Sequence, residues 1–184
     1  MKLEKEYRYI GFDLHKVYNE AVKIAPAKLV KYKRAVFDIP GSDGWLRLRT
    51  DQNKTTLTVK INLKGEGNIN HSMEEEVHVD DFDSTIKILD ILGYKPRSIQ
   101  NNYRILFNIK GTQFTIDIWP KISPVIEIEA DEDAQIQEVE KIFGLSNFYT
   151  PKTITDLYKD IDIDVKFYKE LDFDVVPDII NYHK

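Results

Sequence analysis

Apolar and polar residues alternate along many short stretches of this chain, a pattern typical of β-strands with one buried face. Leu46 and Leu48 flank Arg47, and Ile126 and Ile128 flank Glu127. Side chains two positions apart in a strand lie on the same side of a sheet, so each such strand has an apolar face and a charged face. We expect strands at residues 2–10, 28–38, 45–50, 54–63, 73–79, 97–109, 113–119 and 125–130.

Apolar residues at helical spacing predict helices between these groups of strands. The clearest helix is expected at residues 82–92, where Gly93 is a suitable residue to end it. Asp13 is a suitable N-cap for a helix at residues 13–24. Two further helices are expected at residues 131–143 and 153–159.

The strands are mostly linked as hairpins, which predicts an antiparallel sheet. Helices need an apolar surface to pack on, so we expect the apolar strand faces to point outward and the charged faces inward. The predicted fold is therefore α+β, a closed eight-stranded antiparallel β-barrel whose lumen is charged and whose helices pack outside. We expect a single domain over residues 1–184, with a core at about 2–159 and a peripheral tail at 160–184.

Composition excludes several classes of function. The 184 residues include 31 acidic and 26 basic side chains, a formal net charge of −5, so no dedicated nucleic-acid partner is expected. The absence of cysteine excludes disulfides, zinc–thiolate sites and cysteine nucleophiles. No apolar run approaches transmembrane length, so we expect a cytoplasmic protein without a membrane partner.

The charged positions are sorted by sign from strand to strand. One strand carries only Glu127 and Glu129 on its charged face, whereas another carries only Arg47 and Arg49. Burying such charges is costly unless they are paired, and pairing offsets the cost only in part. A polyphosphate with its divalent cations would satisfy both signs, because guanidinium groups bind phosphate and carboxylates bind Mg²⁺ or Mn²⁺.

The order and spacing of these charges resemble the CYTH superfamily of triphosphate tunnel metalloenzymes, which includes thiamine triphosphatases, inorganic triphosphatases, RNA triphosphatases and class IV adenylate cyclases. The resemblance covers about residues 2–159. The fold of the family is an eight-stranded antiparallel tunnel. The motifs that carry it are Glu4-x-Glu6-x-Arg8, Arg47-x-Arg49, Lys60, Glu74/Glu76, Arg104, Asp117 and Glu127-x-Glu129. The chain departs from the commonest first motif by having Arg8 in place of lysine, which keeps the charge.

The resemblance implies a role for each motif. The residues implied to bind metal, as two Mg²⁺ or Mn²⁺ ions, are Glu4, Glu6, Glu76, Asp117, Glu127 and Glu129. Glu76 is favoured over Glu74, which shares its strand face. The residues implied to bind the triphosphate are Arg8, Arg47, Arg49, Lys60 and Arg104. Glu4, Glu6 and Lys152 are implied to be catalytic, with Lys152 matching a lysine of the family's C-terminal helix.

The leading hypothesis is metal-dependent hydrolysis of a triphosphate. The substrate would be inorganic triphosphate, thiamine triphosphate or a nucleoside triphosphate. The first alternative is a class IV-type adenylate cyclase that converts ATP to cyclic AMP and pyrophosphate. The second is a non-catalytic protein that binds polyphosphate or nucleotide. In each case the partner is a small-molecule triphosphate, and a homodimer is a reasonable assembly for a barrel of this size.

Overall fold

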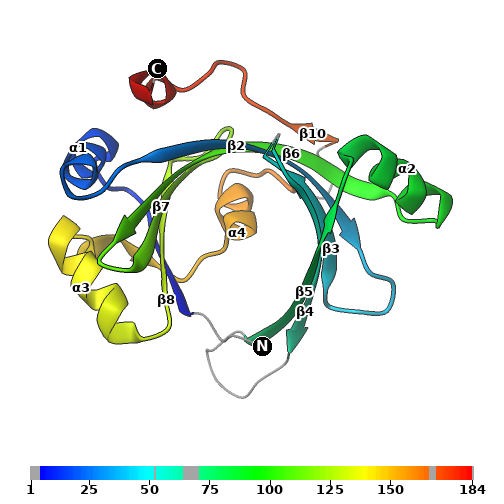
Figure 1. The fold of residues 1–184 in the computed structure, drawn as a ribbon, viewed down its shortest axis with the longest axis horizontal. Coiled ribbons are helices and arrows are strands. Elements are labelled where there is room, and N and C mark those ends of the chain that lie inside the picture. The colour runs from blue at the N-terminus through cyan, green and yellow to red at the C-terminus, as the bar shows by residue number, and fades with distance from the viewer. Residues whose placement is uncertain (1–4, 52, 64–70, 166–168, 184) are drawn as a thin grey trace. The chain divides into compact units, whose positions relative to one another are not determined.

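A computed structural model describes residues 5–51, 53–63, 71–165 and 169–183. The described residues form four α-helices and a ten-stranded, mostly antiparallel sheet (Figure 1). The strands are β1 (Lys5–Tyr9), β2 (Lys28–Asp38), β3 (Trp45–Thr50), β4 (Thr55–Leu63), β5 (His71–Val79), β6 (Pro96–Ile109), β7 (Thr112–Ile118), β8 (Val125–Ala130), β9 (Tyr149–Thr150) and β10 (Glu170–Leu171). The helices are α1 (Leu14–Ile24), α2 (Phe82–Ile91), α3 (Asp133–Phe143) and α4 (Ile154–Lys159), and 3-10 turns occupy Ser146–Phe148 and Asp178–His183.

The alternating pattern predicted these elements closely. The strands β2, β3 and β8 have the predicted bounds, and all four predicted helices are present. Asp13 is the N-cap of α1, and its carboxylate accepts a hydrogen bond from the backbone N–H of Lys16 at 3.0 Å. The two-residue strands β9 and β10 were not predicted, because so short a segment carries no periodicity.

The hydrogen-bonded strand order is β5-β4-β3-β2-β6-β7-β8-β1-β9, and β10 lies parallel to β6. Within the described part of the chain, no ladder joins β5 to β1 or β9. The α+β class and the antiparallel pairing are thus confirmed, whereas closure of the sheet into a barrel stays a prediction.

The chain divides into two compact units, which are described separately. Unit 1 comprises residues 31–101 and 163–172, and unit 2 comprises residues 2–30, 102–162 and 173–184. Unit 1 therefore contains β3, β4, β5, α2 and β10, and unit 2 contains β1, β7, β8, β9, α1, α3 and α4.

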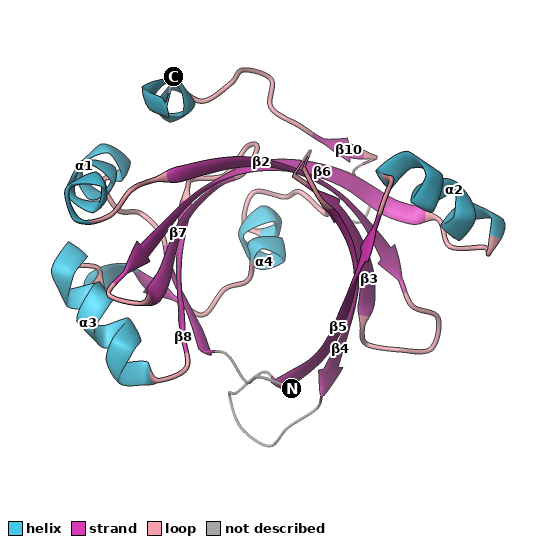
Figure 2. Ribbon diagram, in the orientation of Figure 1, coloured by secondary structure: helices cyan, strands magenta, loops and turns pink. Residues whose placement is uncertain are grey.

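The apolar strand faces of unit 2 pack against two helices. Ile116 on β7 and Ile128 on β8 are fully buried in one cluster with Ala21 of α1 and Ile136 of α3. Figure 2 shows α1 and α3 on one side of β7 and β8 and α4 on the other. The expectation that the oily faces look toward helices is therefore confirmed for this unit.

Unit 1 follows the same rule with a smaller core. Phe37 on β2 and Leu48 on β3 are fully buried, and Phe82 and Leu89 of α2 belong to the same cluster. The other face of these strands is left to polar side chains, since neighbours along a strand alternate sides.

The C-terminal tail contributes to both units. Leu171 of β10 is fully buried in unit 1, and Ile179 and Ile180 join the cluster of unit 2. Within the residues that the structure describes, no helix has the length and apolar character needed to cross a membrane.

Candidate functional site

Strand register decides which charged side chains of unit 2 are neighbours, because residues directly opposite in an antiparallel pair share a face. Arg8 lies opposite Glu127, and Glu6 lies opposite Glu129, across the β1–β8 ladder. Arg104 lies opposite Asp117 across the β6–β7 ladder. We call these six side chains the acidic face: Glu6, Arg8, Arg104, Asp117, Glu127 and Glu129.

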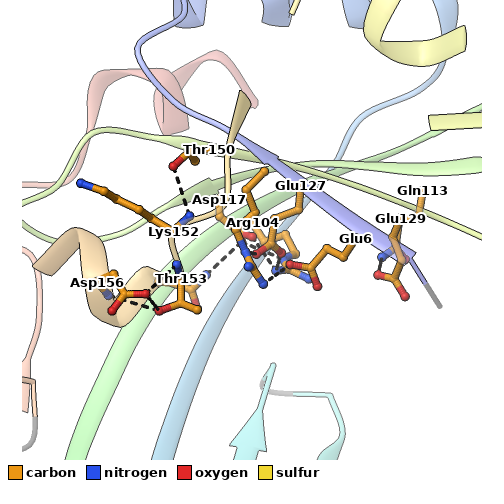
Figure 3. Close-up of polar contacts among 12 residues, drawn as sticks. Glu6, Arg104, Gln113, Asp117, Glu127, Glu129, Thr150, Lys152, Thr153 and Asp156 are labelled. Atoms are coloured by element: carbon orange, nitrogen blue, oxygen red, sulfur yellow. Dashed lines mark hydrogen bonds and ion pairs between the residues drawn. The ribbon is translucent and has the colours of Figure 1, made fainter. Parts of the chain in front are cut away.

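A chain of alternating charges runs through the acidic face (Figure 3). The Arg104 guanidinium donates to Asp117 Oδ1 at 2.6 Å and to Glu127 Oε2 at 2.7 Å. Arg8 Nε donates to the other oxygen of Glu127 at 3.1 Å, and a second nitrogen of Arg8 forms an ion pair with Glu6. Each arginine thus bridges two carboxylates, an arrangement that fixes all of these side chains.

Burial and ion pairing shift the pKa values of Asp117 and Glu127 in opposite directions. Burial raises the pKa of Asp117 to about 6, although the positive charge of Arg104 opposes the shift. Burial also works to raise the pKa of Glu127, but the charges of Arg104 and Arg8 outweigh it and hold this pKa well below its usual range. Glu127 is therefore the firmly ionised member of the pair.

Glu6 and Glu129 place two like charges directly opposite each other, which destabilises a strand pair unless a cation lies nearby. Gln113 donates to Glu129 at 2.8 Å. Next to them, Thr115 lies opposite Glu127 and is 1% exposed, and its hydroxyl has no hydrogen-bond partner among the described residues. Carboxylate and hydroxyl oxygens are suitable ligands for Mg²⁺ and Mn²⁺.

The described residues contain no preformed group of three or more His, Asp or Glu side chains spaced to hold a metal ion. Glu4, which the resemblance places in the metal-binding set, lies outside the described residues. The opposed pair of Glu6 and Glu129 fits a divalent cation in charge and donor type, and it supplies two of the ligands that such an ion needs.

Lys152 precedes α4, which begins with a capping box between Thr153 and Asp156. The Lys152 ammonium donates to Asp160 at the other end of this helix at 2.7 Å, and both side chains are about half exposed. In Figure 3 the Lys152 side chain extends away from the cluster of Arg104, Asp117 and Glu127. The structure therefore pairs Lys152 with Asp160 and does not bring it to the acidic face.

The polar face of unit 1 is rich in cations. Arg47 and Arg49 of β3 lie opposite Thr58 and Thr56 of β4, and Lys60 lies opposite Glu74 of β5. On the other side of β3, Arg34 of β2 lies directly opposite Arg49. We call these six side chains the basic face: Arg34, Arg47, Arg49, Lys60, Glu74 and Glu76.

The ion pairs of Glu74 on the basic face are longer than the arginine–carboxylate contacts of the acidic face. Glu74 lies 3.6 Å from both Arg47 and Lys60. Glu76 accepts a hydrogen bond from the Thr58 hydroxyl at 2.7 Å. Burial works to raise the pKa of Glu76, but this hydrogen bond and the charges of Arg49 and Arg47 lower it overall, so the carboxylate is ionised at neutral pH.

The structure brings the predicted residues together in two sets. Glu6, Arg8, Arg104, Asp117, Glu127 and Glu129 share the acidic face, and Arg47, Arg49, Lys60 and Glu76 share the basic face. Arg34, Thr115 and Gln113 also lie on these faces and were not predicted from the sequence. Arg34 follows Tyr32 and Lys33, a run whose alternation is weak, so only pairing with Arg49 identifies its face.

Comparison with known proteins gives one family and a set of similar folds. The family model described as the CYTH domain matches residues 10–157, well over half of the chain. A conserved hypothetical protein from Pyrococcus furiosus is 21% identical with a TM-score of 0.71, over 84% of this chain and 99% of that one. No curated protein matches the sequence.

Two further solved structures have the same fold. An adenylate cyclase-like protein from Vibrio parahaemolyticus is 17% identical with a TM-score of 0.65, over 86% of this chain and 98% of that one. An adenylyl cyclase-like protein from Hippeastrum, described as having a dominant triphosphatase activity, is 17% identical with a TM-score of 0.61, over 87% and 96% of the two chains.

Proposed function

Because this chain belongs to the CYTH domain family, we propose that it is an enzyme that hydrolyses a small triphosphate with the help of divalent cations. The observation that carries the proposal is the division of charge between the two faces. Four cations and two carboxylates make up the basic face, whereas two cations and four carboxylates make up the acidic face. The cations of the basic face suit phosphate oxygens, and the carboxylates of the acidic face suit divalent cations.

The basic face supplies the phosphate-binding groups in this proposal. Arg47 and Arg49 are neighbours on one face of β3, and each guanidinium can donate two parallel hydrogen bonds to phosphate oxygens. Lys60 adds a compact charge next to Glu74. These cations would stabilise the negative charge that develops on the leaving diphosphate during hydrolysis.

The acidic face supplies the cation-binding groups. Glu6 and Glu129 are the residues we assign to hold Mg²⁺ or Mn²⁺, because their carboxylates stand directly opposite each other and carboxylate oxygens are ligands that these ions prefer. Such an ion, when bound, neutralises phosphate charge and lowers the pKa of a coordinated water. Arg8 and Arg104 hold Glu127 on the same face as these carboxylates. Their charges lower the pKa of Glu127, so it is ionised and could bind a cation.

Lys152 is the remaining cation that the family resemblance assigns to catalysis. Its exposed ion pair with Asp160 is of a kind that contributes at most about 1 kcal/mol, so exchange of Asp160 for a phosphate oxygen costs little. We therefore keep Lys152 as a candidate phosphate-binding residue that changes partner when substrate is present.

The test is release of phosphate from inorganic triphosphate with Mg²⁺ or Mn²⁺. We expect Glu6→Gln and Glu129→Gln each to lower kcat/KM by about 100-fold or more, since each loses an oxygen ligand with its charge. Glu138→Gln is the matched control, because Glu138 lies on α3 in an exposed ion pair with Lys110. Full activity in both site variants would reject the proposal.

The same assay with ATP separates hydrolysis from the alternatives. The Hippeastrum protein supports hydrolysis as the first choice, since its dominant activity is that of a triphosphatase despite its cyclase-like name. Production of ADP and phosphate supports a hydrolase, whereas cyclic AMP and pyrophosphate would identify a cyclase. Tight binding of triphosphate without turnover under any divalent cation would identify a non-catalytic binding protein.

A further inference from the structure

Arg34 lies on the same face of unit 1 as Arg47 and Arg49, the arginines proposed to bind phosphate, although no sequence motif includes it. It is directly opposite Arg49 across the β2–β3 ladder, and Arg49 is in turn opposite Thr56 of β4. The adjacent residue Ala35 is fully buried in the cluster that contains α2, so it occupies the other face. Arg34, Arg49 and Thr56 therefore form one row across three strands.

Two guanidinium groups directly opposite each other repel, and such a pair destabilises a sheet unless other groups compensate. One compensating group is the ring of Tyr32, which lies two positions from Arg34 on the same strand face. The guanidinium carbons of Arg49 and Arg34 lie 4.9 Å and 6.0 Å from the centre of this ring. Both guanidiniums thus contact one ring, and this leaves both of them positively charged.

A tetrahedral phosphate suits this arrangement. Opposite positions of an antiparallel pair have Cβ atoms about 4.5–5.5 Å apart, so two planar guanidiniums there can donate to different oxygens of one phosphate group. The adjoining cavity is lined by Tyr32, Arg49, Asp51, Lys54 and Thr56, and its volume of about 10 Å³ holds about one water molecule. It is too small to enclose a phosphate group, which would contact the two guanidiniums from outside this cavity.

We propose that Arg34 is a further phosphate-binding residue and that Arg34 and Arg49 together hold one phosphate group of the substrate. This inference rests on the proposed binding of a triphosphate by the basic face, but it does not depend on hydrolysis. It extends the cations of that face from β3 and β4 to β2.

The experiment is calorimetric titration of inorganic triphosphate into the full chain without divalent cations. Arg34→Gln is expected to weaken binding about 10- to 100-fold, the range for losing charge-assisted hydrogen bonds. Arg34→Lys keeps the charge but loses the paired donors, so it should recover part of the affinity. In steady-state hydrolysis we expect Arg34→Gln to raise KM more than it lowers kcat.

Lys33→Gln is the matched control, because it removes one positive charge from the adjacent position on the opposite face. The Lys33 ammonium lies 4.9 Å from the ring centre of Phe82 on α2, outside the basic face. We expect this variant to bind triphosphate as the natural protein does. Thermal unfolding of each variant confirms that it is folded, and Arg34→Lys serves as the test variant if Arg34→Gln is not.

The outcomes separate this inference from the proposed function. Weaker binding in the Arg34 variants with normal binding in Lys33→Gln supports the inference, even if the protein shows no hydrolysis. Normal binding in the Arg34 variants, alongside lost binding in Arg47→Gln, overturns it and leaves the proposed function intact. Equal losses in the Arg34 and Lys33 variants also overturn it, since they indicate only a general effect of charge.

Discussion

The two charged faces of this protein use similar residues in opposite ways. On the acidic face, Arg8 and Arg104 bond to Glu127 and Asp117 at 2.5–3.1 Å, and the Asp117 side chain is 1% exposed. On the basic face, Glu74 is 3.6 Å from the two cations that it serves, and its side chain is 40% exposed. The carboxylates of the first face are closely bonded to arginine, whereas Glu74 on the second face lies farther from its two cations.

This difference suggests separate roles for the two faces in binding cations and phosphate. Buried, fully paired charges rigidify a structure, and breaking such a network is costly. Loosely paired, partly exposed cations can exchange a carboxylate for a phosphate at little cost. We infer that the acidic face positions carboxylates for cations, while the basic face meets the anionic substrate.

The largest effect that tests this comparison is expected at Glu127. Removing its carboxylate in Glu127→Ala leaves Arg8 and Arg104 without their shared partner, so we expect the free energy of unfolding to fall by about 3 kcal/mol or more. Urea denaturation measures this change. Glu138→Ala on α3 breaks an exposed ion pair and should cost less than about 1 kcal/mol. Equal costs in both variants would show that the network is not tightly coupled.

The next effect concerns pH and Asp117. Its pKa is raised to about 6 in the folded protein, above the ordinary value of about 3.9, so the folded state binds more protons between these values. The titration of Asp117 therefore makes the free energy of unfolding fall as pH rises from about 4 to about 6. Asp117→Asn should lack this decline.

Urea denaturation of both proteins at several pH values in EDTA checks the prediction. The difference in stability between the natural protein and Asp117→Asn should change between pH 4 and 6 and be constant above about pH 7. Parallel curves across the whole range would contradict the raised pKa of Asp117.

Replacing Glu74 is expected to change stability only slightly and to strengthen the binding of triphosphate. Glu74→Gln removes a distant and partly exposed carboxylate, so the free energy of unfolding should change by less than about 1 kcal/mol. Arg47 and Lys60 then lose a competitor for phosphate, and triphosphate should bind up to about fivefold more tightly. Calorimetry checks the affinity, and weaker binding would indicate that Glu74 orients these cations instead.

The sequence predicted the faces of the strands well because alternation is a local property. Leu46 and Leu48 proved buried and Arg47 and Arg49 lie on the opposite face, as period-two spacing requires. Register is not local, so the opposition of Glu6 to Glu129 could not be derived from either strand alone. The same limit hid Arg34, whose face is fixed by its pairing with Arg49.

Partners of long side chains were also beyond the sequence. Lys152 was assigned to the phosphate chain by resemblance, yet its ammonium pairs with Asp160, eight residues away across α4. The tail showed no clear periodicity, although Leu171 is fully buried beside β6. Burial of isolated residues in irregular segments depends on the tertiary structure and leaves little trace in the local pattern.

The most direct test of the account is a crystal structure with Mn²⁺ and imidotriphosphate, in which nitrogen replaces the bridging oxygens and blocks hydrolysis. We expect phosphate oxygens to contact Arg47 and Arg49, and an anomalous manganese peak beside Glu6 and Glu129. Phosphate bound elsewhere on the protein, with no manganese at these glutamates, would contradict the assignment of the two faces.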